Sequence, residues 1–391
     1  MKVLTFTSLF PNRMQRNLGG FIARRMSFWA SIYASQWITV APVPYFPKLP
    51  FGSPWKAYSD VDPFELFKKW QVYHFRYLML PKIGLPIQGQ SMAVCTAQKI
   101  RRLILQKGPF DLIDAHFIYP DAFAAMQISR KFGIPLVVSA RGSDINYYSQ
   151  IDAIRPRIKA VLKYADAIIG VSKNLVEKMV SLGAPENRCH HIPNGVDSRQ
   201  FCPVGNNKEE KPLRNLLAVG NLVPEKGFDL LLKAVSLLKP AYPDIQLKII
   251  GVGPEFSRLS SLCEAYQIKE NVRFPGQVDH REIHPWFQGA GIFCLSSLRE
   301  GNPNVILEAL ATGIPVAATP VGGVPELIHE NRNGVLSHDF SPESLAQAIG
   351  SVLERNWSAK EIRKTVLDKT WESVARDLQT IFKKVSHKKL N

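Results

Sequence analysis

Short apolar runs and amphipathic segments alternate along most of the chain. The runs at 110–117, 134–141 and 166–172 have the length of strands, and the segments between them carry apolar residues at a helical period. Such alternation is typical of parallel strands covered by helices on both faces of a sheet. In this part of the chain the pattern predicts helices over residues 121–133, 155–165 and 173–183.

A polar segment at 202–214 interrupts this pattern. It holds Pro, Gly and Asn without periodicity and predicts a linker. After it the alternation begins again, with predicted strands at 215–222, 245–253, 272–278, 291–297 and 314–320, and predicted helices at 228–243, 255–268, 281–290 and 304–313. A chain of 391 residues favours about two domains of roughly 150–200 residues each. We therefore predict an α/β protein with two doubly wound, Rossmann-like domains, whose ligands bind beyond the carboxyl ends of the strands.

Composition narrows the class of protein. Hydrophobic residues make up 46% of the chain and charged residues 21%, as in soluble globular proteins. The five cysteines are scattered without close pairs, which fits a reducing cytoplasm. The apolar start of the chain is ended by Pro11 and Arg13, so it reads as a strand and not as a signal peptide. No apolar run approaches the roughly 20 residues of a membrane span, so we expect that the protein is not integral to a membrane.

The net charge of +16 is concentrated near the start of the chain. Up to residue 107 there are fifteen Lys and Arg residues against three acids, with aromatic residues between them. Such a surface suits nucleic acid, an anionic membrane or a phosphate-bearing substrate. A basic face that only keeps the protein soluble is an equally ordinary explanation, and charge alone does not decide between them.

Two glutamates flank a turn that joins a predicted strand to a predicted helix. Glu300 follows the strand at 291–297, the turn Gly301-Asn302-Pro303-Asn304 comes next, and Glu308 lies in the following helix, expected over 305–312 with Asn304 as its N-cap. Free amides and the helix dipole favour an anion at this helix start, phosphate above all. A carboxylate on each side suits the hydroxyls of a sugar and of a ribose, although acids near helix starts are also common for structural reasons.

The stretch EGNPNVILEALATGIPVAATPVGGVPEL resembles the signature of family 4 of the retaining glycosyltransferases, which have the two-domain GT-B fold. Further matches occur in the order of that family: SLFPNRMQRNLGGF, DLIDAHFIYPDA, SARGSDIN, IGVSKNL, IPNGVD, VGNLVPEKGFDLLL and IIGVGPE. The match covers nearly the whole chain and is weakest between residues 45 and 105. The opening, with VAPVPYFP, is similar to members that build cell-surface polysaccharides, including the teichuronic-acid type.

The resemblance implies a role for each matching position. Glu300, Lys226 and His116 would be catalytic: Glu300 holds a donor-sugar hydroxyl, Lys226 pairs with the diphosphate, and His116 faces the transferred sugar. Glu308 would hold the ribose. The donor side would further include Gly19, Gly20, Asn221, Val278, Gly301, Asn302, Asn304 and Val305.

Two positions depart from the family pattern. Asn221 stands where an arginine is frequent, so Lys226 and the helix start would carry more of the leaving-group charge. The usual His-Gly-Ser-Asp stretch begins here with Arg141, and we assign Arg141 and Asp144 to the acceptor side.

The resemblance also implies the organisation of the chain. An acceptor-binding domain would span 1–200 and a nucleotide-sugar-binding domain 201–370, facing each other across a cleft. An amphipathic helix over 371–391 would cross back to the first domain.

The implied reaction is transfer of a sugar from a nucleotide diphosphate sugar to a hydroxyl, with retention. The acceptor would be lipid-linked or a glycan, and the protein would work in the cytoplasm, peripheral to an anionic membrane surface. We predict no cofactor and no metal: Asp60-Val61-Asp62 resembles a metal-binding Asp-x-Asp, but it lies in a poorly matching loop. Nucleic acid is not expected as a partner. A basic nucleic-acid-binding protein and a sugar phosphorylase of similar fold are the alternatives.

Overall fold

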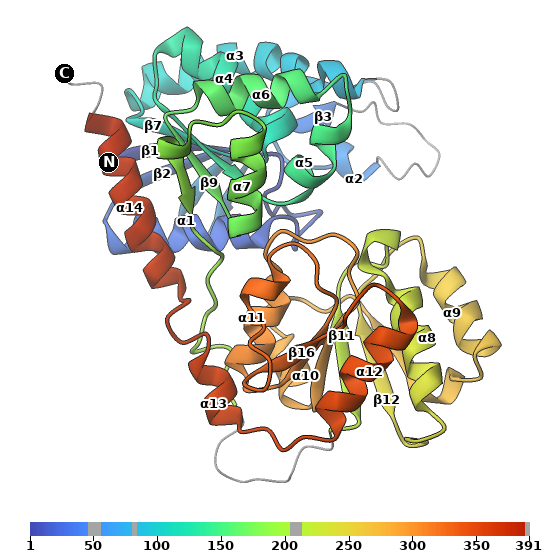
Figure 1. Ribbon diagram of the computed structural model, residues 1–391. Helices are drawn as coiled ribbons and strands as arrows, with labels where there is room; N and C mark the ends of the chain where they lie inside the picture. Colours follow the sequence, from blue (N-terminus) through green and yellow to red (C-terminus); the bar gives the residue numbers. More distant parts are fainter. Residues whose placement is uncertain (46–55, 80–83, 204–212, 388–391) are drawn as a thin grey trace. The chain divides into compact units, whose positions relative to one another are not determined.

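The computed structural model describes residues 1–45, 56–79, 84–203 and 213–387. The chain divides into two compact units (Figure 1). The amino-terminal unit comprises Met1–Asn194 and Trp371–Asn391, and the carboxyl-terminal unit comprises Gly195–Thr370. Most of the linker predicted at 202–214 lies outside the described residues.

The amino-terminal unit is built on an eight-stranded sheet with the order β10-β9-β8-β7-β1-β2-β5-β4. Its ladders are parallel except for the antiparallel pair β4–β5 at one edge. A separate parallel ladder joins β3 and β6. The strands are β1 (Lys2–Phe6), β2 (Gln36–Val40), β3 (Val43–Tyr45), β4 (Phe64–Phe67), β5 (Trp70–Tyr73), β6 (Arg76–Leu78), β7 (Leu112–His116), β8 (Leu136–Ala140), β9 (Ala167–Gly170) and β10 (Cys189–His191).

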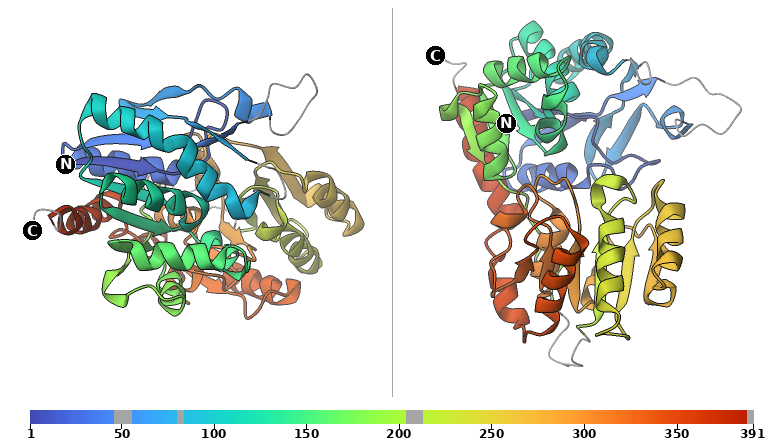
Figure 2. Two further views of the ribbon diagram at one scale, coloured as in Figure 1. Left: turned by 90° about the horizontal axis from the view of Figure 1, so that it is seen from above. Right: turned by 45° about the vertical axis from the view of Figure 1, so that its right-hand side comes forward.

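Helices lie on both faces of this sheet (Figure 2). Successive residues of a strand point to opposite faces, so one strand supplies two cores. Leu4 and Phe6 join the core shared with α3, α4 and α6, whereas Val3 joins the core shared with α1 and α14. The helices of the unit are α1 (Gly20–Ile32), α2 (Lys56–Ser59), α3 (Gln88–Lys107), α4 (Phe123–Phe132), α5 (Ser143–Asn146), α6 (Arg155–Tyr164), α7 (Lys173–Ser181) and α14 (Trp371–His387).

The last helix, α14, packs on α1 although some 350 residues separate them in the sequence (Figure 1). Its buried residues recur at helical spacing and form one apolar face. The ring of Phe382 contacts Trp29 edge-on, with centroids 5.2 Å apart, and the indole N–H of Trp29 donates to Gln379 at 2.8 Å. The chain therefore completes the amino-terminal unit with its last described residues.

The carboxyl-terminal unit has a six-stranded parallel sheet with the order β13-β12-β11-β14-β15-β16. Leu217 of β11 joins one core, and its neighbours Leu216 and Ala218 join the core on the other face. The strands are β11 (Asn215–Val219), β12 (Gln246–Ile250), β13 (Val272–Gly276), β14 (Ile292–Leu295), β15 (Val316–Ala318) and β16 (Gly334–Leu336), and the helices are α8 (Phe228–Leu238), α9 (Phe256–Ala265), α10 (His284–Gln288), α11 (Asn304–Ala311), α12 (Pro342–Leu353) and α13 (Ala359–Lys364).

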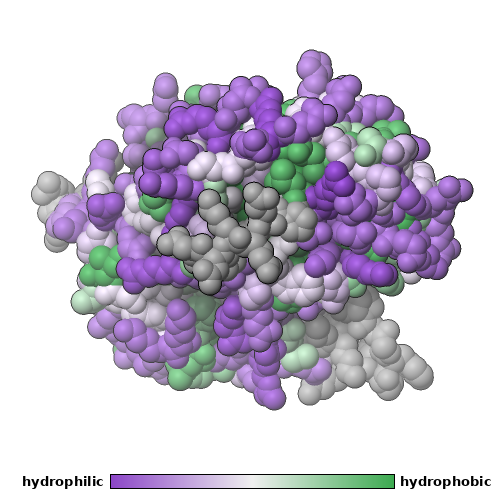
Figure 3. Space-filling model, turned by 90° about the horizontal axis from the view of Figure 1, so that it is seen from below, coloured by the Kyte–Doolittle hydropathy of each residue, from purple (hydrophilic) through white to green (hydrophobic). Residues whose placement is uncertain are grey.

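These two sheets confirm the predicted α/β class with two Rossmann-like domains. The least predictable part is 45–105, where the structure adds the β4–β5 hairpin, the β3–β6 ladder and the twenty-residue helix α3. No described helix is both long enough and apolar enough to cross a membrane. Hydrophilic residues cover most of the face drawn in Figure 3, with hydrophobic residues only in small patches.

Candidate active site

Glu300 lies beyond the carboxyl end of β14, beside Lys226 from the loop after β11. The ammonium Nζ of Lys226 donates to Glu300 Oε1 at 2.6 Å, and the hydroxyl of Ser297 donates to the same oxygen at 2.8 Å. Both side chains are largely enclosed, with 27% of Lys226 and 12% of Glu300 exposed. The carboxylate is therefore fixed in place.

Glycines allow the loops around Glu300 to pack closely. Gly322 has a left-handed backbone, and a Cβ there would lie 2.1 Å from the carbonyl oxygen of Glu300. Gly227 is also left-handed, and a Cβ there would lie 2.2 Å from the carbonyl oxygen of Ser296. Both positions require a glycine, because a side chain would meet backbone that cannot move aside. The loops after β11, β14 and β15 thus form one packed unit.

The helix after this turn, α11, begins at Asn304 and has Pro303 at its N-cap. The expectation that Asn304 caps the helix is therefore wrong: no side chain caps it, because Asn304 has itself entered the helix. Its Oδ1 is enclosed and makes no hydrogen bond within the described chain. The N–H groups of Asn304 and Val305 precede the first intrahelical bonds, and with the buried turn residues Gly301 and Asn302 they form a helix start that favours an anion.

Glu308 lies one turn further into α11 and is only 3% exposed. Its Oε1 is 2.6 Å from Nε2 of His280, a residue of the loop after β13. A buried carboxylate needs such a partner. The sequence analysis did not identify His280. Its one signal was its position two residues after Val278, which is half-buried against the core that contains Ile306 and Leu307 of α11. Asn221, by contrast, is exposed at the end of β11.

The carboxyl-terminal unit thus brings together one lysine, two fixed carboxylates and the start of a helix. The lysine and the helix start are both electropositive and suit a phosphate or diphosphate. The carboxylates suit neutral hydroxyl groups, since a carboxylate accepts hydrogen bonds from them. The arrangement is suited to bind a molecule with a phosphate group between two hydroxylated parts.

In the amino-terminal unit, His116 belongs to a buried network at the carboxyl end of β7. Its Nε2 lies 2.8 Å from Asp114 Oδ2, and its Nδ1 accepts a hydrogen bond from the guanidinium of Arg141. Arg25 pairs with Asp114 from the other side at 3.4 Å and donates to Ser139 at 2.9 Å. Arg141, at the position where the resemblance implies a histidine, therefore contacts His116 directly.

Burial sets the protonation of this network. It lowers the pKa of His116 to about 3, and neighbouring Asp114 only partly offsets this effect. Burial alone would raise the pKa of Asp114, but His116, Arg25 and Arg141 together lower it to about 2. Because Nδ1 accepts from Arg141, the ring carries its proton on Nε2 and donates it to Asp114. At neutral pH the network holds a neutral imidazole beside an ionised carboxylate.

Asp144 and Gly19 have structural contacts in this unit. The carboxylate of Asp144 accepts hydrogen bonds from the backbone N–H groups of Ile118, Arg141 and Gly142, at 2.9, 3.0 and 2.8 Å. It is fully buried, and it fixes the turns after β7 and β8. Gly19 is left-handed, and a Cβ there would lie 2.0 Å from a backbone oxygen of the same loop, whereas a Cβ at Gly20 would meet open space.

The predicted site residues therefore fall into two groups. Gly19, Gly20, His116, Arg141 and Asp144 belong to the amino-terminal unit. The larger group belongs to the carboxyl-terminal unit and consists of Asn221, Lys226, Val278, Glu300, Gly301, Asn302, Asn304, Val305 and Glu308.

Two family models match this chain. Residues 66–200 match Glycosyltransferase Family 4, and residues 203–367 match Glycosyl transferases group 1. A putative teichuronic acid biosynthesis glycosyltransferase, TuaC of Bacillus subtilis, is 31% identical over 364 residues, which cover 89% of this chain and 88% of that protein. A GDP-mannose-dependent mannosyltransferase of Mycolicibacterium smegmatis, named for phosphatidylinositol monomannoside, is 25% identical and covers 90% and 89%.

Solved structures show the same fold. A sucrose-phosphate synthase from Thermosynechococcus elongatus superposes with a TM-score of 0.78 at 18% identity, covering 98% of this chain and 99% of that one. Anabaena HepE in complex with UDP-glucose superposes with a TM-score of 0.66 at 17% identity, covering 99% of each chain.

With this fold and these matches, the protein is a nucleotide-sugar-dependent glycosyltransferase of the retaining type, with the GT-B fold. The chain belongs to glycosyltransferase family 4.

Proposed function

We propose that the carboxyl-terminal unit binds a nucleoside diphosphate sugar at the start of α11, and that the enzyme transfers this sugar to a hydroxyl of a cell-surface polysaccharide precursor. The observation that carries the proposal is the contact between Lys226 and Glu300 at 2.6 Å, beyond the carboxyl ends of β11 and β14. In open parallel sheets this is the end at which ligands bind.

The proposed roles follow from the charge of each group. Lys226 and the amides of Asn304 and Val305 stabilise the diphosphate as it leaves. Glu300 holds a hydroxyl of the donor sugar, and Glu308 holds the ribose. A diphosphate is a weak base, so its departure needs charge stabilisation more than a proton. We favour front-face attack, in which the leaving phosphate takes the acceptor proton.

The acceptor proposal rests on the named relatives. TuaC is named for teichuronic acid biosynthesis, and WcaL of Escherichia coli, 27% identical over 250 residues, is named for colanic acid biosynthesis. Both names refer to polysaccharide assembly. We therefore propose a lipid-linked or glycan acceptor, and His116 with Arg141 on the acceptor side of the transferred sugar.

We further propose that the protein works in the cytoplasm and binds a membrane peripherally, through the exposed face of α3. Val94, Arg101 and Leu105 lie on one face of this helix, and Val94 and Leu105 are 66% and 75% exposed. Exposed Arg102 lies beside them. Large apolar side chains among cations are typical of helices that lie on anionic lipid. Sedimentation with phosphatidylglycerol vesicles tests this surface, and a Leu105→Asp variant that sediments as well as the wild type would contradict it.

Donor binding is tested by thermal unfolding with a panel of UDP-, GDP-, ADP- and dTDP-sugars. A ligand present at 100 times its Kd stabilises the folded protein by about 2.7 kcal/mol, which moves Tm by several degrees. The stabilising sugar nucleotide is then incubated with candidate acceptors, and NMR gives the anomeric configuration of the product. If no member of the panel raises Tm and none is consumed, the proposal is wrong.

A further inference from the structure

The side chain of Arg141, just beyond β8 in the amino-terminal unit, does not use all its donors within the protein. Its Nη1 donates to the side-chain oxygen of Asn194 at 3.1 Å, and its Nη2 donates to Nδ1 of His116. Its Nε is enclosed and has no partner among the described residues, so contact with a ligand falls to Nη1 and Nη2. Each of these carries two N–H groups, and one on each remains after the two bonds. Arg141 is half-buried, so part of the residue reaches the surface.

Both acceptors of the Arg141 guanidinium are neutral groups. No carboxylate forms an ion pair with it among the described residues: Asp114 pairs with Arg25, and Asp144 accepts three backbone N–H groups. Burial lowers the pKa of Arg141 and nearby Arg25 lowers it further, whereas Asp114 and Asp144 act in the opposite direction. A guanidinium nevertheless stays protonated at neutral pH. The protein thus holds a partly desolvated cation without an anion of its own, which a bound anion would stabilise.

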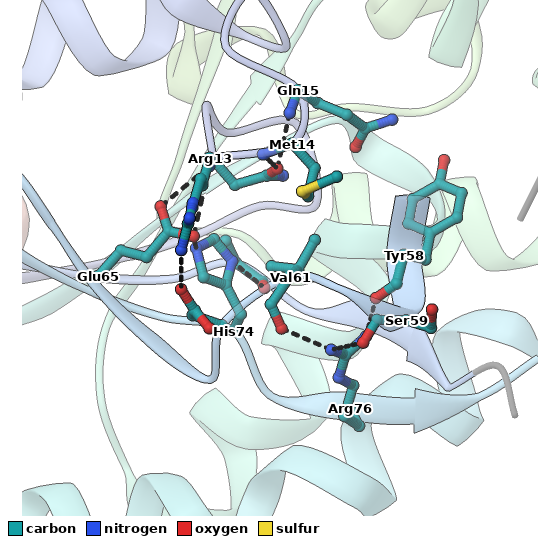
Figure 4. Close-up of polar contacts among 12 residues, drawn as sticks. Arg13, Met14, Gln15, Tyr58, Ser59, Val61, Glu65, His74 and Arg76 are labelled. Atoms are coloured by element: carbon teal, nitrogen blue, oxygen red, sulfur yellow. Dashed lines mark hydrogen bonds and ion pairs between the residues drawn. The ribbon is translucent and has the colours of Figure 1, made fainter. Parts of the chain in front are cut away.

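Arg76, another arginine of this unit, has contacts of a structural kind (Figure 4). Its guanidinium donates to the carbonyl oxygens of Tyr58, Ser59 and Val61, the last at 2.6 Å, and so fastens the segment before β4. The side chain of Arg141 donates to no backbone carbonyl in the described part of the chain. Fastening a loop therefore does not explain the charge at position 141.

A second electropositive group, the start of α1, lies beside Arg141. The guanidinium carbon of Arg141 is 5.1 Å from the ring centroid of Phe21, which belongs to the first turn of this helix. No side chain caps α1, its first turn holds no acid, and its first backbone bond is made by the N–H of Ile22. The N–H groups of Gly20 and Phe21 precede that bond, and a Cβ at Gly20 would meet open space. Such a helix start favours an anion.

The loop that leads from β1 into α1 is held in place by its own contacts. The backbone N–H of Arg13 donates to Glu65 at 3.1 Å, which ties the loop to β4 (Figure 4). Oδ1 of Asn12 accepts from the N–H groups of Met14 and Gln15 at 3.0 and 2.9 Å. A site whose parts are already ordered loses little entropy when a ligand binds.

We infer that Arg141, together with the start of α1, binds an anionic group of the acceptor, a carboxylate or a phosphate carried by a sugar. This inference rests on the proposed function and specifies the class of its acceptor. The planar guanidinium suits both groups, because its parallel N–H groups match two oxygens at once. His116 offers no ring nitrogen for this purpose, since Nε2 contacts Asp114 and Nδ1 accepts from Arg141. Arg141 is thus a residue that selects charged acceptors over neutral ones.

The direct test compares three glycosides that differ only at C6: methyl glucoside, methyl glucuronide and methyl glucoside 6-phosphate. Their dissociation constants are measured by saturation-transfer NMR on the full chain. We expect one of the two charged glycosides to bind at least about tenfold more tightly than methyl glucoside, as for a hydrogen bond to a charged group. Which of the two binds more tightly distinguishes a carboxylate from a phosphate. If none of the three binds, or if methyl glucoside binds as tightly as both others, the inference is wrong.

Two sets of variants assign the preference to this place. Arg141→Gln should abolish it, whereas Arg188→Gln should keep it; Arg188 is the matched control, a half-buried arginine of the same unit that donates to the carbonyl oxygen of Ala165 at 3.2 Å. Gly20→Asp should weaken the charged glycoside about tenfold by placing an acid at the helix start, and Gly20→Asn should not. Both fit the open space at Gly20, so this pair decides the question if Arg141→Gln unfolds. A folded Arg141→Gln with the wild-type preference would overturn the inference.

A nucleotide experiment separates this inference from the proposed function. The diphosphate of the donor is also an anion, so UDP, GDP, ADP and dTDP are titrated into the wild type and Arg141→Gln. If Arg141→Gln weakens a nucleoside diphosphate about tenfold and the three glycosides do not differ, the anion belongs to the donor and only the acceptor assignment is wrong. If no sugar nucleotide binds or is consumed, the proposed function fails, and the glycoside comparison still reports on Arg141.

Discussion

Replacing Lys226 with methionine tests the proposed donor site most directly. Methionine keeps most of the length and apolar packing of the side chain but removes the ammonium group that donates to Glu300 at 2.6 Å. Two consequences follow, one for folding and one for catalysis, and their magnitudes differ enough to be told apart.

The folding cost is modest. A hydrogen bond between charged groups contributes about 1.5–3 kcal/mol, out of a total stability of about 5–15 kcal/mol. Even the largest loss from the smallest total leaves about 2 kcal/mol, so more than about nine in ten molecules remain folded. Removing a preorganised group that stabilises developing charge costs about 10²–10³ in rate, or about 2.7–4 kcal/mol. A fall in kcat of that size cannot come from unfolding.

The assay is release of nucleoside diphosphate from the sugar nucleotide identified by thermal unfolding. Lys269→Met is the matched control, since Lys269 also pairs with a glutamate, at 2.7 Å to Glu264, on the exposed surface of the same unit. We expect a loss of about 10²–10³ for Lys226→Met and wild-type turnover for Lys269→Met. If Lys226→Met stays within about threefold of the wild type while remaining folded, Lys226 does not stabilise the leaving group.

Three further outcomes are expected. Glu308→Gln should raise the KM for the sugar nucleotide about tenfold with a smaller change in kcat, as steady-state kinetics would show, because a charge-assisted hydrogen bond to the ribose is lost. Burial raises the pKa of Asp121 to about 7, so the folded state binds a proton that the unfolded chain releases near pH 4. The protonated carboxyl therefore stabilises the folded state at low pH, and this stabilisation is lost as pH rises from about 4 to about 7. Asparagine does not titrate, so the free energy of unfolding of Asp121→Asn in urea, relative to that of the wild type, should rise over this window and stay constant above it. Gly322→Ala should lower the free energy of unfolding by about 1–3 kcal/mol and should also lower turnover, because the new Cβ would press on the backbone of Glu300. Gly350→Ala, within α12, is the control and should lower neither; equal melting temperatures for the two variants would contradict this prediction.

The alternation of strands and helices was predictable because each element buries an apolar face with its own period. Residues 110–200 and 215–320 follow this rule, and the fold class was confirmed there. Residues 45–105 did not follow it: the exposed hairpin β4–β5 mixes polar and aromatic residues at a sheet edge, so no clear period remains. Propensity alone does not identify such an edge strand, because its stability comes from the neighbour it pairs with.

The site was predictable where the chain itself brings the groups together. Glu300, the turn after it and Glu308 are close in sequence, and their placement followed from one strand and one helix. The contacts of Glu308 with His280 and of Arg141 with His116 join segments that are far apart in the sequence, and no local sequence pattern predicts them. The capping prediction for Asn304 failed because the helix begins one residue earlier than its pattern indicated.

The return of α14 to α1 has a consequence for synthesis of the chain on the ribosome. When residue 194 has been made, the face of α1 that receives Trp371 and Phe382 still lacks its cover, and it stays open until the last helix emerges. The carboxyl-terminal unit, by contrast, is one continuous stretch, and all the strands described in it have been made by residue 336. Domains fold as units during translation, so the unit made second is the first that can finish. A stop codon that removes only the final helix would therefore damage the unit that was begun first.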